Sequence, residues 1–218
     1  MATAPFHRPV LVIDTTGRWC AAALRCPDGR VFVRDESMER GQAERLAPLV
    51  AELLAEAGIT PGELWRIGVA TGPGSFAGTR AGTAFARGLA LASGAQALGI
   101  SSLSALAREV DPDGLATVFA AHDARRGELV WQVFEQGKPL GEAVRSDVAE
   151  AGAAFAASGA AHLAGSGARL LDASSIWRDH ALLHALLALS AEASAEAPLP
   201  SPHYARPPDA ALPGGIVP

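Results

Sequence analysis

The sequence predicts an α/β protein in which sheet is flanked by helices. The chain opens with "PVLVIDTT" (Pro9–Thr16), a short apolar run with polar residues at its end, which is typical of a buried strand. A second apolar run, "LWRIGVATG", follows a segment whose leucines recur at helical spacing. Strands and helices then alternate through the first half of the chain, and this alternation is the pattern of α/β folds.

The other elements of the first half follow from turn signals and periodicity. "RWCAAALR" and "RVFVRDES" are predicted strands, separated by Asp28-Gly29, a dipeptide typical of hairpin turns. The segment 43–57 is predicted to be a helix, with Leu46, Leu49 and Leu53 on one face. "AQALGISS" is a predicted strand, and "SLSALAREV" is a predicted helix that begins at a serine.

The second half is Ala-rich and carries fewer signals. "ATVFAAHDARRGELVWQVFE" predicts two strands joined by a polar connection, and "DHALLHALLALSAEASAE" predicts a helix. The last stretch, from Pro198, is rich in proline and has no periodicity, so we expect an extended tail on the surface.

Composition and charge restrict the function classes. Hydrophobic residues make up 49% and charged residues 19% of the 218 residues, which is a globular composition. The net charge of −5 disfavours tight nucleic-acid binding by the chain alone, because phosphate contacts need a basic face. No apolar run is long enough for a membrane span and the start does not resemble a signal peptide, so we expect a cytoplasmic protein. Cys20 and Cys26 are expected to be free thiols.

The segment "ATGPGSFAGTRAGTAFARGLALASG" (Ala70–Gly94) follows a predicted strand and is rich in glycine. It is not a P-loop, since no Lys follows a Gly, and its G-x-G-x-x-x-G spacing is one residue too long for the dinucleotide motif. One interpretation is an anion bound at the start of the next helix, with Ser75 as the cap and Arg80 adding charge. The other is a tight strand-to-helix turn, and the spacing alone favours it.

Gly78, Gly82 and Gly88 fall inside the helix predicted over 77–93, where each costs about 0.5–1 kcal/mol relative to Ala. Together with nearby alanines they leave a flat surface that suits the close approach of another backbone, either the chain's own sheet or another subunit. Arg80 and Arg87 are seven residues apart and therefore lie on one side of this helix. The preceding helix carries acidic residues of complementary charge, namely Glu44, Glu52 and Glu56.

Two shorter motifs leave alternatives open. "IDTTG" (Ile13–Gly17) is similar to the first phosphate loop of actin-like and sugar-kinase-like ATPases, and its simpler interpretation is a turn organised by Asp and Thr. His180 and His184 lie four residues apart, a spacing that suits zinc on a helix, but no third ligand is evident. We therefore predict no metal site.

Several segments together are similar to one family. "LVIDTTGRWCAAAL", "GPGSFAGTRAGTAFARGLALASG", "GISSLSALA", "DARRGELVWQVFE", "GSGARL" and "SPHYARPPDAA" follow the order and spacing of the TsaB family, formerly labelled glycoprotease-like. The resemblance covers nearly the whole chain. It implies an actin-like ATPase or ribonuclease H-like fold of two related subdomains. We expect these at 1–104, with the dimerisation helices, and at 105–218, with the Pro-rich tail.

The resemblance also implies a function in tRNA modification. Family members are non-catalytic scaffolds that pair with the catalytic subunit TsaD and, with the ATPase TsaE, support transfer of a threonylcarbamoyl group to the adenosine next to the anticodon. The first two helices of the family form the dimer surface. We accordingly expect a homodimer when the chain is alone, and tRNA contact only through the complex. The residues expected to bind the partner are Leu46, Leu49, Leu53, Arg80, Gly82, Phe85 and Arg87.

The resemblance implies no cofactor of the chain's own, with ATP or ADP expected at most at the heterodimer interface. If a nucleotide contacts this chain, the expected residues are Asp14, Thr15, Gly74 and Arg80. Gln42 stands where many relatives have His. The rival interpretation is a small-molecule kinase or ATPase of the same fold, which needs a second phosphate loop.

Overall fold

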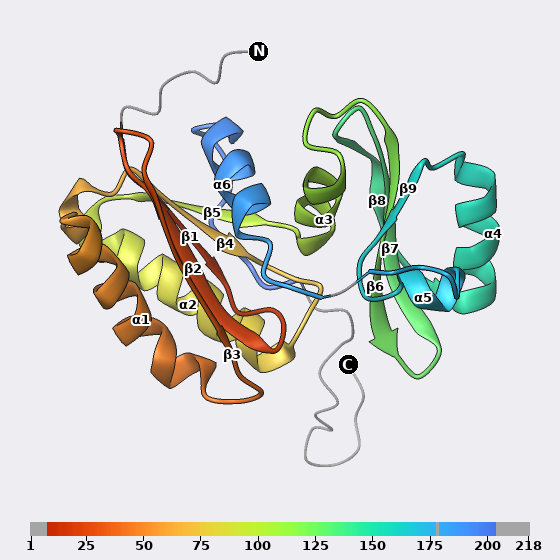
Figure 1. Ribbon diagram of the computed structural model, residues 1–218, viewed down its shortest axis with the longest axis horizontal. Coiled ribbons are helices and arrows are strands. Elements are labelled where there is room, and N and C mark those ends of the chain that lie inside the picture. Colours follow the sequence, from red (N-terminus) through yellow and green to blue (C-terminus); the bar gives the residue numbers. More distant parts are fainter. Residues whose placement is uncertain (1–7, 178, 204–218) are drawn as a thin grey trace.

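The computed structural model describes residues 8–177 and 179–203, which form two lobes, each built on one sheet (Figure 1). The first lobe contains five strands and the second contains four. The elements in chain order are β1 Val10–Asp14, β2 Trp19–Arg25, β3 Val31–Ser37, α1 Gln42–Ala57, the 3-10 turn η1 Pro61–Glu63, β4 Arg66–Ala70, α2 Phe76–Ser93, β5 Gln96–Ile100, α3 Ser102–Val110, β6 Thr117–Arg125, β7 Glu128–Glu135, β8 Lys138–Asp147, α4 Val148–Ser158, β9 His162–Ala164, α5 Ala168–Leu171 and α6 Leu183–Glu192.

The first sheet has the strand order β3-β2-β1-β4-β5. Strands β1, β2 and β3 are antiparallel neighbours, whereas β1, β4 and β5 run parallel. The two parallel connections require crossovers, and α1 and α2 supply them on one face of the sheet (Figure 1). The three opening strands and the helices predicted over 43–57 and 77–93 are therefore confirmed, each helix beginning one residue earlier than expected.

Side chains of β1 alternate between two hydrophobic cores, as a strand buried on both faces requires. Leu11 and Ile13 pack with the leucines of α1, and Val10 and Val12 pack with α6, α3 and the second sheet. The two cysteines are free and buried in the first of these cores. Burial raises the pKa of the Cys20 thiol to about 11, so this group stays protonated at neutral pH.

The second sheet repeats the topology of the first without its fifth strand. Its order is β8-β7-β6-β9, with β6, β7 and β8 antiparallel and β9 parallel to β6. Helix α4 connects β8 to β9 as α1 connects β3 to β4. The predicted fold class is confirmed: two related α/β subdomains with mixed sheets flanked by helices, the first in the strand order of ribonuclease H-like folds.

The end of the described chain returns to the first lobe. Helix α6 packs against β1 and β4, and the segment after it contacts β5, where the Gln96 side chain donates to the carbonyl oxygens of Ser194 and Ala195. The buried Arg66 guanidinium donates to the carbonyl of Ser190 at 2.7 Å and so holds the end of α6. Residues 183–203, which were expected in the C-terminal subdomain, therefore pack against the first sheet.

Helix α6 is shorter than predicted. It begins at Leu183, so His180 precedes the helix and does not share a helical face with His184. Most of the proline-rich tail lies outside the described residues, which end at His203. No helix within 8–177 and 179–203 combines the length and apolar character that crossing a membrane requires.

Candidate functional site

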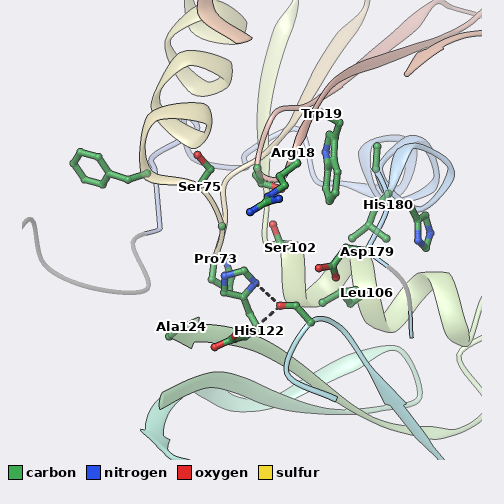
Figure 2. A pocket seen from close by; sticks show the side chains of 18 of the residues that line it. Arg18, Trp19, Pro73, Ser75, Ser102, Leu106, His122, Ala124, Asp179 and His180 are labelled. Atoms are coloured by element: carbon green, nitrogen blue, oxygen red, sulfur yellow. Dashed lines mark hydrogen bonds between the residues drawn. The ribbon is translucent and has the colours of Figure 1, made fainter. Parts of the chain in front are cut away.

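Two surfaces are candidates for function. The first is a cleft of about 1380 Å³ between the lobes, which we call the inter-lobe cleft. Its walls come from the ends of β1 and β6, the loop before α2, the start of α3 and the loop before α6 (Figure 2). The second, the outer helical face, is the side of α1 and α2 that points away from the first sheet (Figure 1).

The turn after β1 is held by the carboxylate of Asp14, which is 1% exposed. One carboxylate oxygen accepts from the Thr16 backbone N–H at 2.9 Å and from the Thr16 hydroxyl at 2.7 Å. The other oxygen accepts from the Leu182 N–H at 3.2 Å and so connects β1 to the segment before α6. Three intrachain donors therefore satisfy the carboxylate that was a candidate nucleotide contact.

The glycine-rich loop approaches the chain's own backbone. A Cβ atom on Gly74 would lie 2.5 Å from the carbonyl oxygen of Thr16, and one on Gly78 would overlap the carbonyl oxygen of Thr15. The Thr15 hydroxyl in turn donates to the Gly78 carbonyl at 2.7 Å and is fully buried. Ser75 caps α2 by accepting from the Gly78 N–H, as predicted. The tight-turn interpretation of this segment is confirmed.

A hydrogen-bonded pair lines the cleft, formed by His122 of β6 (Figure 2) and by Ser166 in the loop after β9. Ser166 Oγ accepts from the Asp123 N–H at 2.9 Å and lies 3.1 Å from His122 Nδ1. Both lone-pair and donor capacity of Ser166 are used when its hydroxyl donates to Nδ1, which leaves the ring hydrogen of His122 on Nε2. Burial lowers the pKa of His122, so the ring is neutral at pH 7.

Charged side chains of both signs line the cleft. Arg18 lies 3.0 Å from Glu39, and Arg125 lies 3.1 Å from Asp123. Trp19 lies against Gly17, where a Cβ atom would overlap its indole ring, so the indole covers one side of the loop after β1. Burial and the nearby Asp14 charge raise the pKa of Asp35 in the same cleft.

The outer helical face consists mainly of small exposed side chains. A Cβ atom on Gly88 would meet no atom within 4 Å, and Leu91, one helical turn further, is 88% exposed. This surface is therefore free of packing within the described chain. Its members are Ala47, Pro48, Ala51 and Ala55 of α1, and Ala77, Arg80, Ala84, Arg87, Gly88 and Leu91 of α2.

The charges beside this face differ from the predicted complementarity. Arg45 holds Glu52 at 2.7 Å, and Arg34 holds Glu56, so two of the three acids of α1 already have partners in the chain. Arg80 lies over the Phe76 ring at 4.9 Å, and no ion pair of Arg80 or Arg87 occurs within the described residues. Glu44 is the remaining exposed acid among the three predicted.

Several residues predicted to bind the partner serve the chain's own core instead. Leu46, Leu49 and Leu53 are at most 1% exposed and pack beneath the first sheet, because the apolar side of α1 faces inward. A Cβ atom on Gly82 would lie 2.5 Å from the Thr15 hydroxyl oxygen, so this glycine is required by the fold. Gly82→Leu is therefore expected to disrupt the fold of the monomer.

The other residues predicted to bind a partner or a nucleotide differ in how exposed they are. Arg80 and Arg87 are exposed, and Phe85 is half-buried against the core. Gly74 and Arg80 line the cleft, whereas Asp14 and Thr15 are buried behind it. Gln42 is buried at the start of α1, where its amide donates to the Met38 carbonyl at 3.3 Å.

Sequence reasoning missed the pair His122–Ser166 and the open side of Gly88. The segments "ATVFAAHDARRGELVWQVFE" and "GSGARL" hold these two residues, but their contact links positions 44 residues apart. Within the described residues no group of three or more His, Cys, Asp or Glu is arranged to hold a metal ion.

Comparison with known proteins finds a family model and relatives that are named for tRNA modification. The family model described as "TsaD: tRNA N6-adenosine threonylcarbamoyltransferase" matches residues 33–171. The chain is 34% identical over 128 residues to the "tRNA threonylcarbamoyladenosine biosynthesis protein TsaB" of Escherichia coli, covering 58% of this chain and 55% of that protein. It is 31% identical to the protein of the same name from Haemophilus influenzae, covering 65% of this chain and 58% of that protein. The matches thus span little more than half the length of these relatives.

A solved structure extends the similarity to most of the chain. A Pseudomonas aeruginosa protein titled "an uncharacterized protein with similarity to peptidase YEAZ" is 28% identical, with a TM-score of 0.72. The match covers 89% of this chain and 98% of that one. The similarity therefore includes both lobes.

Proposed function

Because the chain belongs to the TsaB family, within the group that the TsaD family model describes, we propose that it acts in the biosynthesis of tRNA threonylcarbamoyladenosine. Its proposed role is that of a non-catalytic scaffold, which pairs with the catalytic subunit TsaD and works with the ATPase TsaE. The names of its relatives support the pathway, and the outer helical face supports the scaffold role.

The observation that carries the proposal is the open surface of α1 and α2. Small side chains at Ala84 and Gly88 allow a partner helix to approach closely, and the exposed Leu91 adds apolar area to bury. Such a surface is available without any rearrangement of the chain. A scaffold that binds TsaD here raises activity by binding its active conformation more tightly than its inactive one.

The intrachain hydrogen bonds around the inter-lobe cleft favour the scaffold role over that of a small-molecule kinase. A kinase needs backbone N–H groups directed at phosphate where strands β1 and β6 end. Here the N–H of Thr16 is bonded to Asp14, and the N–H groups of Asp123 and Arg125 are bonded to Ser166 and Asp123. We therefore propose that ATP or ADP, if bound, lies at the interface with TsaD.

Charge distinguishes the partner from a second copy of this chain. Arg80 and Arg87 lack acidic partners within the described residues, and Glu44 is the exposed acid of α1 that forms no ion pair there. A homodimer through the same face is self-complementary in shape and leaves most of this positive charge uncompensated. We expect a weak homodimer and a tighter heterodimer with a partner that is acidic at this contact, through which the complex reaches tRNA.

Sedimentation velocity of the chain, alone and mixed with TsaD of the same organism, tests the proposal. We expect a one-to-one complex that displaces the homodimer and recruits TsaE when ATP is present. The absence of a complex, together with ATP turnover by the chain alone, would reject the scaffold in favour of the kinase. A charge reversal far from the face, Lys138→Glu in β8, serves as the matched control and should bind like the wild type.

A further inference from the structure

The inter-lobe cleft has an unpartnered hydroxyl at its base. Ser102, the first residue of α3, is 6% exposed and lines the cleft, yet its Oγ has no hydrogen-bond partner among the described residues. In Figure 2 its hydroxyl points toward the space near Arg18. A buried hydroxyl without a partner costs about 1–3 kcal/mol, so the fold retains a group that a ligand would satisfy.

Two further donors line the same cleft. His122 is neutral, and its Nε2–H has no partner among the described residues while Ser166 occupies Nδ1. Arg18 pairs with Glu39, but both side chains are more than three-quarters exposed, and such a pair holds its members weakly. A hydroxyl, a ring N–H and a guanidinium together suit a carboxylate, which accepts hydrogen bonds on two oxygens.

The loop before α6 supplies a negatively charged hydrogen-bond acceptor, the carboxylate of Asp179. Asp179 accepts one hydrogen bond from Trp177 Nε1 at 3.0 Å, which orients the carboxylate and leaves its other acceptor sites open. Trp19 and Trp177 also line the cleft, and indole faces attract ammonium groups. A carboxylate beside aromatic rings suits a primary ammonium group.

The charges of the cleft exclude ligands dominated by one sign. Arg18, Arg80 and Arg125 stand against Asp35, Glu39, Asp123 and Asp179, so neither a polyphosphate nor a polyamine finds a complementary lining. A ligand that carries both a positive and a negative charge finds a complementary lining.

We propose that the inter-lobe cleft binds a small zwitterion of the free amino acid class. Arg18, Ser102 and His122 bind its carboxylate, and Asp179 with the two tryptophans binds its ammonium group. The cleft shares Arg80 with the outer helical face, but none of these proposed ligand contacts belongs to that face, so the proposal stands whether or not the chain pairs with TsaD.

The test is calorimetric titration of the isolated full chain with each of the twenty amino acids, followed by the N-acetyl and amide derivatives of any that bind. We expect at least one amino acid to bind saturably, and blocking either end to weaken it. Ser102→Ala should weaken the free amino acid about two- to tenfold and leave the amide unaffected, because the amide lacks the carboxylate. Asp179→Asn should weaken the free amino acid about tenfold or more and leave the N-acetyl derivative unaffected.

Matched variants separate the site from general effects of charge and helix composition. Ser104→Ala, on the same helix but outside the cleft, and Asp113→Asn, an exposed acid of the second lobe, should bind like the wild type. Ser102→Ala is expected to fold, since it removes a buried polar group that has no partner. The proposal is overturned if no amino acid binds at millimolar concentration, if the blocked derivatives bind equally well, or if the control variants lose binding to the same extent.

Discussion

The inter-lobe cleft and the outer helical face contrast in how the chain uses its own groups. Directly behind the cleft, the side chains of Asp14 and Thr15 are bonded within the chain, and so are the backbone N–H groups of Thr16 and Asp123 at the ends of β1 and β6. On the outer face, Gly88 and Leu91 contact little, and Arg80 and Arg87 form no ion pair within the described residues. The polar groups of the loops whose motifs suggested phosphate binding are therefore hydrogen-bonded within the chain. The outer side of the amphipathic helices α1 and α2, in contrast, is open to a partner.

Substitution of the glycines in α2 tests this difference between the two regions with the largest expected effect. Gly82→Leu inserts a side chain between α2 and the Thr15 turn, where even a Cβ atom would lie 2.5 Å from the Thr15 hydroxyl. We expect a loss of about 3 kcal/mol or more in the free energy of unfolding. Chemical denaturation of the purified variant measures it, and a variant as stable as the wild type would mean that the Thr15 turn yields without cost.

The same substitution on the opposite side of α2 should leave the monomer intact. Gly88→Leu meets open space, and the better helix propensity of Leu should stabilise the monomer by about 0.5–1 kcal/mol. Binding to TsaD should be lost, because the added bulk prevents close approach of the partner helix. Thermal unfolding and a pull-down with TsaD check both halves of this expectation, and normal pull-down would place the interface elsewhere.

These two glycines show how far the sequence predicts the fold and the site. The strands of the first lobe, the two crossover helices and the Ser75 cap follow from periodicity and local signals, which act over a few residues. Which side of α2 faces the chain depends on the Thr15 turn, more than sixty positions away, and no local pattern contains that contact. For the same reason the sequence did not show that the leucines of α1 pack in the chain's own core. Their spacing predicts an apolar stripe but does not say which part of the protein covers it.

Reversing charges on the outer helical face should weaken TsaD binding less than adding a bulky side chain at Gly88 does. Arg80→Glu with Arg87→Glu should weaken TsaD binding, and the difference from wild type should shrink as salt is raised, because exposed charges are screened. Equal affinities at low salt would leave both arginines as ordinary surface charges. Titrations at two ionic strengths, with Lys138→Glu as the control, measure the effect.

The smallest expected effect lies in the cleft and depends on pH. Burial lowers the folded-state pKa of His122 below its ordinary value of 6.5, so the unfolded chain binds this proton more readily. The contribution of His122 to stability is present above pH 6.5 and declines as pH falls below it. His122→Gln should flatten this decline between pH 7 and the lower pKa in thermal-unfolding curves, and an unchanged slope would assign the decline to other groups.

Hydroxyl-radical footprinting of the chain with and without TsaD tests the central claim most directly. Leu91 on the outer helical face and Leu115 in the second lobe are 88% and 83% exposed, so they form a matched pair of reporters. We predict that oxidation of Leu91 falls in the complex while that of Leu115 is unchanged. Protection of Leu115 with Leu91 still fully oxidised would contradict the assignment of α1 and α2 as the partner surface.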